Sequence, residues 1–578
     1  KSSIGHIRDM PKKDMGVDIE NNFQPTYAIS ADKKKVVADL KKSVKTATKI
    51  FLATDEDREG EAIAWHLQQA LSLAEDTPRI VFHEITKGAI TDAINNPRTI
   101  DTDLVNAQQA RRIIDRLVGF EISPVLWRKI SGARSAGRVQ SPVVRIVVER
   151  EREISAHNPT SSHKVKANLE NSSNQSLEVK LSVDFKSKEE ALSFAESVLL
   201  AELKVNSVET KPSKRSPKAP FITSTLQQEA SQKLGFSVKQ TMSIAQNLYR
   251  EGAITYMRTD SLNLSELAIS AAQEVIVSKF GSEFHQTRRY KTNSSGAQEA
   301  HEAIRPTDLT KPSILGLDDQ STKLYSLIYK RTLASQMSDA QLQKTKININ
   351  ISNRSEHFIA DGEVLSFAGF LEVYDYMAAE DKLLPEVSKG DLLTLVDLAS
   401  KESFSRAKPR YTEASLVKEI EQMGIGRPST FATMITTVQD RNYVVKETRE
   451  GVQRDYHLIE IEDGVISESI QAETTGAEKN KLFPTNVAYL LVDFLVKNFS
   501  NIIGYEFTAN LESDFDLIAE ESKPWAGVIR DFYEPFHAQI ELAKDISRDE
   551  THGKRDLGED PVSGKPVSVR FGRYGAFA

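Results

Sequence analysis

The sequence predicts a multidomain protein that combines an α/β part, helical parts and a β-rich part. Its 578 residues are too many for one hydrophobic core. Residues 49–54 form a short apolar run typical of a buried parallel strand, and residues 59–73 repeat apolar side chains at helical spacing. Residues 176–183 and 345–351 instead alternate apolar and polar side chains, as half-buried strands do. The chain is therefore predicted to contain several cores of different classes.

The order of these patterns predicts the domain boundaries, with the β-rich domain split by a helical insertion. The predicted boundaries are 1–100 for the α/β domain, 101–157 and 408–535 for a first helical domain, 158–215 and 343–407 for the β-rich domain, 216–342 for the inserted helical domain, and 536–578 for a linker and the start of a C-terminal module.

Composition narrows the classes of function. The chain has no cysteine, which excludes disulfides, thiol catalysis and a tetracysteine zinc site within it. It has no apolar run of about 18 residues, so no membrane span is predicted. The net charge is −7, but residues 104–145 carry eight basic and two acidic side chains. Because binding depends on where charge lies, a local basic channel is compatible with DNA. The chain has no Walker A loop, so nothing predicts ATP use.

The stretch with the clearest catalytic pattern is residues 254–261, ITYMRTDS. Tyr256, Arg258 and Asp260 follow one another at every second position, so an extended segment projects them to one side. A tyrosine hydroxyl with an ordinary pKa near ~10 is a weak nucleophile. A neighbouring arginine can stabilise its phenolate and bind a phosphate with two donors. The spacing fits covalent attack on a phosphodiester, although a surface strand ending in a turn could show the same spacing.

Three carboxylates follow the predicted strand at residues 49–54. Asp55, Asp57 and Glu59 lie between this strand and the next predicted helix. In an open α/β sheet, ligands bind beyond the carboxyl ends of the strands. Oxygen ligands suit a hard cation, so the sequence predicts a Mg²⁺ site here. The alternative is an acidic loop that the helix dipole favours at a helix N-terminus.

Long strings of the sequence resemble the bacterial type IA DNA topoisomerases. Met257, directly after the tyrosine, is typical of the topoisomerase I branch of that family. The resemblance covers nearly the whole chain. The matching strings, in family order, are residues 53–66 for the Toprim domain, 106–112 and 135–141 for the single-strand DNA-binding region, 254–261 for the active-site segment, and 296–306 for a segment with a histidine near the tyrosine.

The resemblance implies ATP-independent relaxation of negatively supercoiled DNA. In this reaction Tyr256 would cleave one strand and keep its 5′ phosphate, the other strand would pass through, and the 3′ hydroxyl would reseal the break. The implied architecture is a torus of a Toprim domain, a helical DNA-holding domain, a β arch and a tyrosine-bearing helical domain. The family also implies Mg²⁺ as cofactor, single-stranded and negatively supercoiled DNA as partner, a monomer, and a cytoplasmic, nucleoid-associated location.

The candidate residues divide into two groups. The catalytic candidates are Tyr256, Arg258, Asp55, Asp57, Glu59 and His301, with the three acids as metal ligands. The DNA-binding candidates are His6, Arg111, Arg112, Asp115, Phe120, Trp127, Ser135, Ala136, Gly137, Arg138, Val139, Gln140, Arg258 and Arg427. Phe120 or Trp127 could stack on bases, whereas a place in the core would suit Trp127 equally well.

Two other functions stay open. The Toprim pattern of the family has an earlier glutamate, followed by a lysine, on a strand that this chain does not include. Roughly two to three dozen preceding residues are therefore expected to be absent, the length of one βα unit. One alternative is a DNA-binding fragment that is catalytically incomplete. The other is a Toprim nuclease or primase, which would not need residues 254–261.

Overall fold

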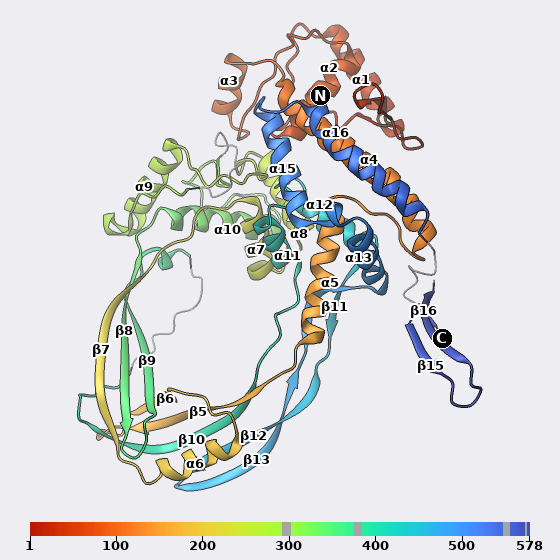
Figure 1. The fold of residues 1–578 in the computed structure, drawn as a ribbon. Coiled ribbons are helices and arrows are strands. Elements are labelled where there is room, and N and C mark those ends of the chain that lie inside the picture. Colours follow the sequence, from red (N-terminus) through yellow and green to blue (C-terminus); the bar gives the residue numbers. More distant parts are fainter. Residues whose placement is uncertain (292–301, 375–383, 547–554, 573–574, 578) are drawn as a thin grey trace.

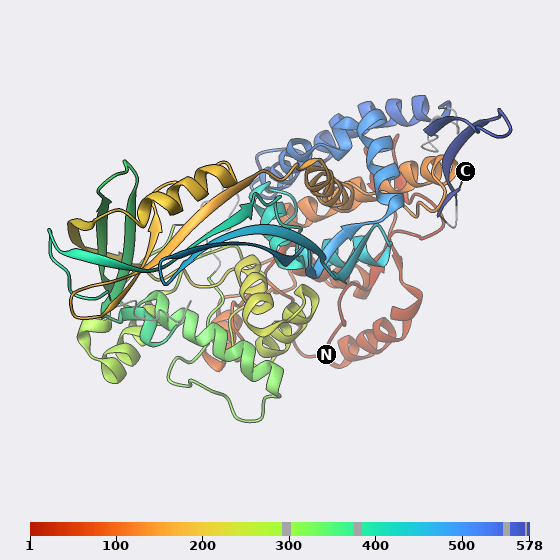
Figure 2. The ribbon, with the colours of Figure 1, turned by 90° about the horizontal axis from the view of Figure 1, so that it is seen from below.

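The computed structural model of the chain describes residues 1–291, 302–374, 384–546, 555–572 and 575–577. Figure 1 shows the chain as a ring, which confirms the predicted torus. The N-terminal residues and several long helices lie at one side of the ring, and long strands form an arch at the other (Figure 1). Figure 2 shows the arch extending to one side of the helical part, with the C-terminal strands at the opposite end.

The N-terminal part is a small α/β unit. Its core contains Ile7, Val37 and Leu52. The predicted parallel pairing is present as one bridge, between Leu52 and Arg79. Beyond this bridge the Arg79 guanidinium binds the carbonyl oxygens of Thr54 and Asp55, which are then not available to a strand ladder. The elements are β1 (Arg8–Asp9), β2 (Val17–Asp18), β3 (Gln24–Pro25), β4 (Ala28–Ile29), η1 (Ala31–Lys33), α1 (Lys34–Thr46), α2 (Arg58–Leu71) and α3 (Lys87–Asn95).

The first helical domain is built from two distant parts of the chain around one core. The helices at residues 505–519 and 525–544 pack on the helix at residues 102–129. This packing places residues near 110 beside residues near 515. The helices are α4 (Thr102–Lys129), α5 (Gln140–Ala156), α11 (Glu413–Gln422), α12 (Phe431–Asp440), α13 (Asn486–Asn498), α14 (Ser500–Ile503), α15 (Tyr505–Ala519) and α16 (Trp525–Lys544).

The arch is an antiparallel sheet in the order β13-β12-β10-β5-β6-β9-β8-β7. A further pairing of β10 with β7, at Leu392 and Lys204, joins the sheet to itself and leaves β12 and β13 as a ribbon on its outside. Helix α6 packs Phe194 and Val198 into the enclosed core. The elements are β5 (Ser161–Glu170), β6 (Ser176–Leu181), α6 (Lys188–Val198), β7 (Leu203–Arg215), β8 (Ala340–Ile351), β9 (His357–Phe367), η3 (Gly369–Glu372), β10 (Leu392–Phe404), β12 (Val452–Glu462) and β13 (Val465–Thr475).

The second part of the helical domain, predicted as residues 408–535, also contains strands. Four strands follow α12: β11 (Val444–Arg449), β12, β13 and β14 (Glu478–Pro484). Ile461 of β12 pairs with Leu398 of β10, and both side chains are buried in the core of the arch. This pairing joins strands more than 50 residues apart, so the local pattern around β12 does not display it.

The inserted helical domain carries the tyrosine segment. Ile254, Tyr256 and Met257 are buried in its core. Its elements are α7 (Thr223–Leu234), α8 (Val238–Arg250), α9 (Glu266–Phe280), η2 (Ser282–Phe284) and α10 (Asp319–Ser335).

A separate sheet near the C-terminus contains β15 (Arg555–Glu559), β16 (Pro566–Gly572) and β17 (Gly575–Phe577). Among the described residues, every helix is too short or too polar to cross a membrane.

Candidate active site

Tyr256 lies where the inserted helical domain meets the N-terminal domain. Its segment is held by backbone hydrogen bonds: Thr255 donates its N–H to the Arg305 carbonyl at 2.9 Å, and Tyr256 donates its own to the His83 carbonyl at 2.8 Å. The segment bends at Thr255, Met257 and Arg258 and is not the uniformly extended segment that the spacing predicted. The ring is 2 % exposed and stands edge-on to Tyr249, with the ring centres 5.2 Å apart. In this closed form of the protein, the contact between the two domains therefore covers the Tyr256 side chain.

The Tyr256 hydroxyl is held by carboxylates. It donates to Asp57 Oδ2 at 2.8 Å and lies 3.4 Å from Asp55 Oδ2. Burial, together with the charges of Asp57 and Asp55, raises the pKa of Tyr256 well above its ordinary value. Arg258 opposes this rise, and its Nη1 lies 3.6 Å from Asp57 Oδ2. The hydroxyl is thus protonated here and needs both a proton acceptor and a positive charge before it can attack.

Asp55 and Asp57 form a pair of like charges beside the hydroxyl. Asp57 caps α2 by accepting the Gly60 N–H at 2.8 Å. Burial and the charge of Asp57 raise the pKa of Asp55. Two such carboxylates fit a Mg²⁺ ion, which usually takes one or two protein oxygens, several waters and a substrate phosphate.

Glu59 is turned away from that pair. Its Oε2 lies 2.9 Å from His6 Nε2 and accepts from Gln108 Nε2 at 3.3 Å. Burial acts to raise the pKa of Glu59, but the hydrogen bond and charge of His6 lower it overall. Within the described residues, no three histidine, aspartate or glutamate side chains converge as metal ligands. The geometry therefore favours two carboxylates, with Glu59 in a supporting position.

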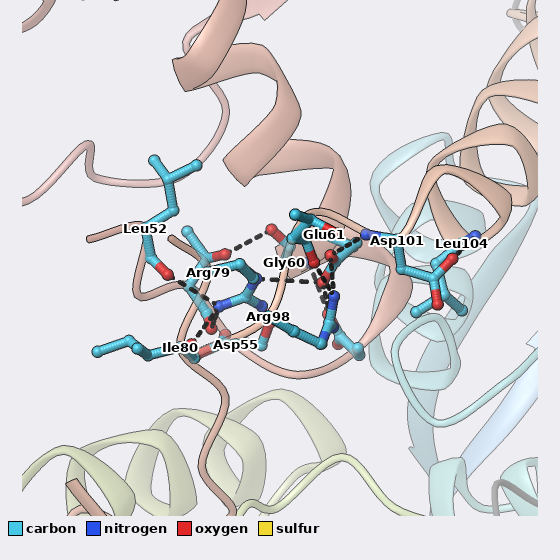
Figure 3. A network of polar contacts seen from close by, with 12 residues as sticks. Leu52, Asp55, Gly60, Glu61, Arg79, Ile80, Arg98, Asp101 and Leu104 are labelled. Carbon is cyan, nitrogen blue, oxygen red and sulfur yellow. Dashed lines mark hydrogen bonds and ion pairs between the residues drawn. The ribbon is translucent and has the colours of Figure 1, made fainter. Parts of the chain in front are cut away.

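A buried arginine fixes the loop that carries the carboxylates (Figure 3). Arg79 is fully buried and donates to the Thr54 carbonyl at 2.9 Å and to the Asp55 carbonyl at 2.7 Å. Its own charge is balanced by Glu61, 3.1 Å away, which also binds Arg98. Because these bonds hold the backbone, the loop keeps the Asp55 carboxylate near that of Asp57 despite their repulsion.

A cavity of about 1100 Å³ lies beside this site. It brings together the N-terminal loop, α2, α4, α8, α12 and the loop before α5. The predicted site residues that line it are His6, Asp55, Glu59, Arg111, Arg112, Asp115, Ser135, Ala136, Gly137, Arg138, Val139, Gln140 and Arg258. Arg427 lines a smaller adjoining cavity of about 60 Å³ with Asp57, Arg58, Glu59, Arg111 and Arg258.

Two predicted residues, Phe120 and Trp127, stand apart from the cavity. Phe120 lines a separate hollow with His537, on another side of α4. Trp127 is 59 % exposed and donates its Nε1–H to the Arg134 carbonyl at 2.6 Å, so the interpretation of Trp127 as a core residue is wrong. Among the described residues, no element buries the Trp127 side chain, which local sequence does not reveal. His301 lies outside the described residues.

Several basic side chains of the cavity, among them Arg111 and Arg138, are paired with carboxylates. Arg111 binds both oxygens of Glu512, at 2.9 and 3.0 Å. Arg138 is fully buried between Asp115, at 3.1 Å, and Glu512, at 2.9 Å. Arg138 was predicted to contact DNA. In this form its side chain is buried, so it can affect DNA binding only through the residues that it contacts, Asp115 and Glu512. Burial opposes ionisation of Glu512, yet the arginines lower its pKa to about 2.

Sequence reasoning missed the acidic partners on α15. Glu512 and Asp516 lie one helical turn apart, and Asp516 binds Arg58 and Arg427, the latter at 2.6 Å. Two acids at this spacing among apolar residues are visible in the sequence, but their partners, up to about 450 positions away, are not. The missed cavity residues also include Gln246, Tyr249, Arg250, Thr433, Thr437 and Arg441.

Comparisons with known proteins cover the whole chain. The model of a DNA topoisomerase family matches residues 99–456, and that of the Toprim domain matches residues 1–85. A "DNA topoisomerase 1" of Campylobacter jejuni is 41% identical over all of this chain and 80% of the relative. One of Streptomyces coelicolor is 39% identical over all of this chain and 65% of the relative. The structure of full-length topoisomerase I from Thermotoga maritima matches 100% of this chain and 91% of its own, with a TM-score of 0.82 and 36% identity.

Proposed function

The chain belongs to the bacterial type IA DNA topoisomerase I family, and on that premise we propose that Tyr256 makes the transient break in DNA. The family makes this chain an isomerase that relaxes supercoiled DNA, which the comparisons favour over a nuclease or a primase. The observation that carries the proposal is the position of the Tyr256 hydroxyl. It lies 2.8 Å from Asp57 and close to Asp55 and Arg258, which line a cavity rich in arginine.

The arrangement supports a reversible transfer of one phosphodiester. The Tyr256 oxygen forms a bond to phosphorus, the bond from phosphorus to the 3′ oxygen breaks, and the phosphate stays on the tyrosine by its 5′ side. The phenol proton passes to Asp57, which already accepts its hydrogen bond, while the leaving 3′ oxygen takes a proton from solvent water. Arg258 stabilises the charge on the phosphate. The reverse steps reseal the strand, and the phosphotyrosine retains the bond energy without a nucleotide.

Trapping with labelled DNA tests this assignment. A single-stranded oligonucleotide is labelled at its 5′ or its 3′ end, incubated with the protein and denatured with detergent. Label from the 3′ end should remain on the protein, in a peptide that contains Tyr256, because a 5′ phosphate link retains the downstream piece. Retention of the 5′ label, or an adduct on another residue, would refute the assignment.

We extend the proposal to the DNA that the cavity accepts. Single-stranded segments are the proposed ligand, because residues 135–140 and the arginine side chains converge on one cavity beside Tyr256. Negatively supercoiled DNA exposes such segments more readily than relaxed DNA does. One chain supplies all of these groups, which supports a monomer. DNA as the proposed ligand supports a location on the nucleoid.

The Arg112 side chain is expected to contribute one phosphate contact. It is half exposed in the cavity, where it binds Asp9 at 2.6 Å. In Arg112→Ala, the slope of log K against log salt for single-stranded DNA should flatten by about 0.7. Arg152→Ala is the matched control, because Arg152 is similarly exposed and binds Asp493 at 2.6 Å away from the cavity. Equal slopes for wild type and Arg112→Ala would place the DNA elsewhere.

The Toprim family generally binds Mg²⁺, and we propose Asp55 and Asp57 as its ligands here. A Mg²⁺ ion held by them would supply positive charge beside the scissile phosphate. The double variant Asp55→Ala, Asp57→Ala should bind Mg²⁺ at least about tenfold more weakly in calorimetry and should reseal cleaved oligonucleotide poorly. Glu75→Ala with Asp76→Ala, an exposed acidic pair outside the cavity, is the control. Full resealing by the double variant in chelator would exclude this metal role.

A further inference from the structure

The loop between α4 and α5 forms one wall of the cavity without regular secondary structure. Residues 135–140 line the cavity. On either side of residues 134–136, the backbone makes local hydrogen bonds. The Ala133 N–H donates to the Ile130 carbonyl at 3.2 Å, and the Ser141 N–H donates to the Gly137 carbonyl at 3.0 Å. The conformation of the middle of the loop must therefore be set by groups from elsewhere in the fold.

Two side chains supply those groups. Trp127 donates its Nε1–H to the Arg134 carbonyl at 2.6 Å, and the Tyr443 hydroxyl makes three further hydrogen bonds. It accepts the backbone N–H of Arg134 at 2.9 Å and that of Ser135 at 3.0 Å, and it donates to the Ser135 carbonyl at 2.8 Å. A hydroxyl has one proton to donate and two lone pairs, so these three bonds use its full capacity. Tyr443 is 1 % exposed and packs in the core of the helical domain.

Tyr443 also connects the loop to a helix that forms another part of the cavity wall. It follows α12, whose Thr433 and Thr437 line the cavity, and its backbone N–H continues the helix end by bonding Val438 at 3.1 Å. Two further bonds join the same helix end to the loop. Arg134 donates to the Asp440 carbonyl at 3.0 Å, and Arg441 donates to the side chain of Gln140.

We propose that Tyr443 is a positioning residue for DNA binding. Its hydroxyl holds residues 134–136 in the conformation that receives the single strand, and it fixes the spacing between this loop and α12. It acts through the loop, since the ring itself is buried in the core. Directly after Tyr443 the chain enters β11, which pairs with β14, and then β12 of the arch. Tyr443 therefore lies where the helical domain leads into the arch. The inference rests on the proposed function only in taking this cavity as the DNA-binding site.

Tyr443→Phe tests the proposal because it removes only the hydroxyl. The dissociation constant for a single-stranded oligonucleotide should rise about tenfold, since the buried backbone groups of the loop lose their partner. The rate of cleavage at saturating oligonucleotide should change by less than about twofold, the pattern of a lost binding contact. Amide hydrogen exchange at Arg134 and Ser135 should accelerate, with the rest of the helical domain unchanged.

Tyr411→Phe is the matched control. Tyr411 is buried in the same core, and its hydroxyl accepts from Arg150 at 2.6 Å, away from the loop. The control should bind DNA as wild type does. Unchanged DNA binding by Tyr443→Phe, or slower cleavage at saturation with unchanged binding, would overturn the proposal.

A measurement on the wild type decides the question if the variant does not fold. The amides of Arg134 and Ser135 should be protected from exchange, and exchange at the rate of free peptide would overturn the proposal. Because neither binding nor amide exchange involves cleavage of DNA, these results are independent of whether the covalent adduct forms on Tyr256.

Discussion

Tyr256→Phe should abolish covalent capture of DNA and relaxation of plasmid, by a factor on the order of 10⁴ or more, as expected when a nucleophile is removed. The substitution deletes only the oxygen that Asp57 binds at 2.8 Å and leaves the ring packed against Tyr249. Binding of single-stranded DNA should therefore remain nearly unchanged. The detergent trap with 3′-labelled oligonucleotide measures the adduct, and fluorescence anisotropy measures the binding.

The control for this variant is Tyr325→Phe. Tyr325 is 2 % exposed in the same domain, and its hydroxyl donates to the Lys311 carbonyl at 2.7 Å, outside the site. It should form the adduct at the wild-type level. A phosphotyrosyl adduct in Tyr256→Phe would show that another residue attacks the DNA, whereas equal loss in both variants would point to the fold of the domain.

Arg258→Ala should lower the rate of cleavage by about 10² to 10³, the usual effect of removing one charge-stabilising donor. Arg258 lies 3.6 Å from Asp57 and opposes the rise in the pKa of Tyr256. Without it, the phenolate and the phosphate both lose their stabilising charge. Arg258→Lys should recover only part of the rate, because a point charge cannot replace a planar fork of donors.

Single-turnover cleavage at saturating oligonucleotide measures this effect apart from DNA binding. Arg250→Ala provides the control, since Arg250 lines the same cavity and lies outside the contacts of the Tyr256 hydroxyl. Its cleavage rate should fall much less than that of Arg258→Ala. Equal rates for the lysine variant and the wild type would show that charge alone is sufficient at this position.

Local sequence patterns were sufficient to predict the features that depend on near neighbours along the chain. Every-second spacing predicted Tyr256 and Arg258 on one side of one segment, and the structure brings both to one site although the segment bends. The alternating runs predicted the arch strands, including β6 and β8. Asp57 was predicted before a helix, where it caps α2. Such features follow from backbone geometry within one element, so a short stretch of sequence is sufficient to define them.

Which distant groups meet could not be predicted from local patterns and became clear only in the folded chain. Folding turned Glu59 toward His6 and away from the aspartate pair, and it buried Arg138 against Glu512. It also joined β12 to the arch, within a stretch predicted as part of the helical domain. The physical reason is that these contacts join separate elements, whose approach depends on how complete faces pack together. Side-chain spacing along the chain carries no information on that packing, and the carboxylate that a buried arginine requires can come from any element that reaches it.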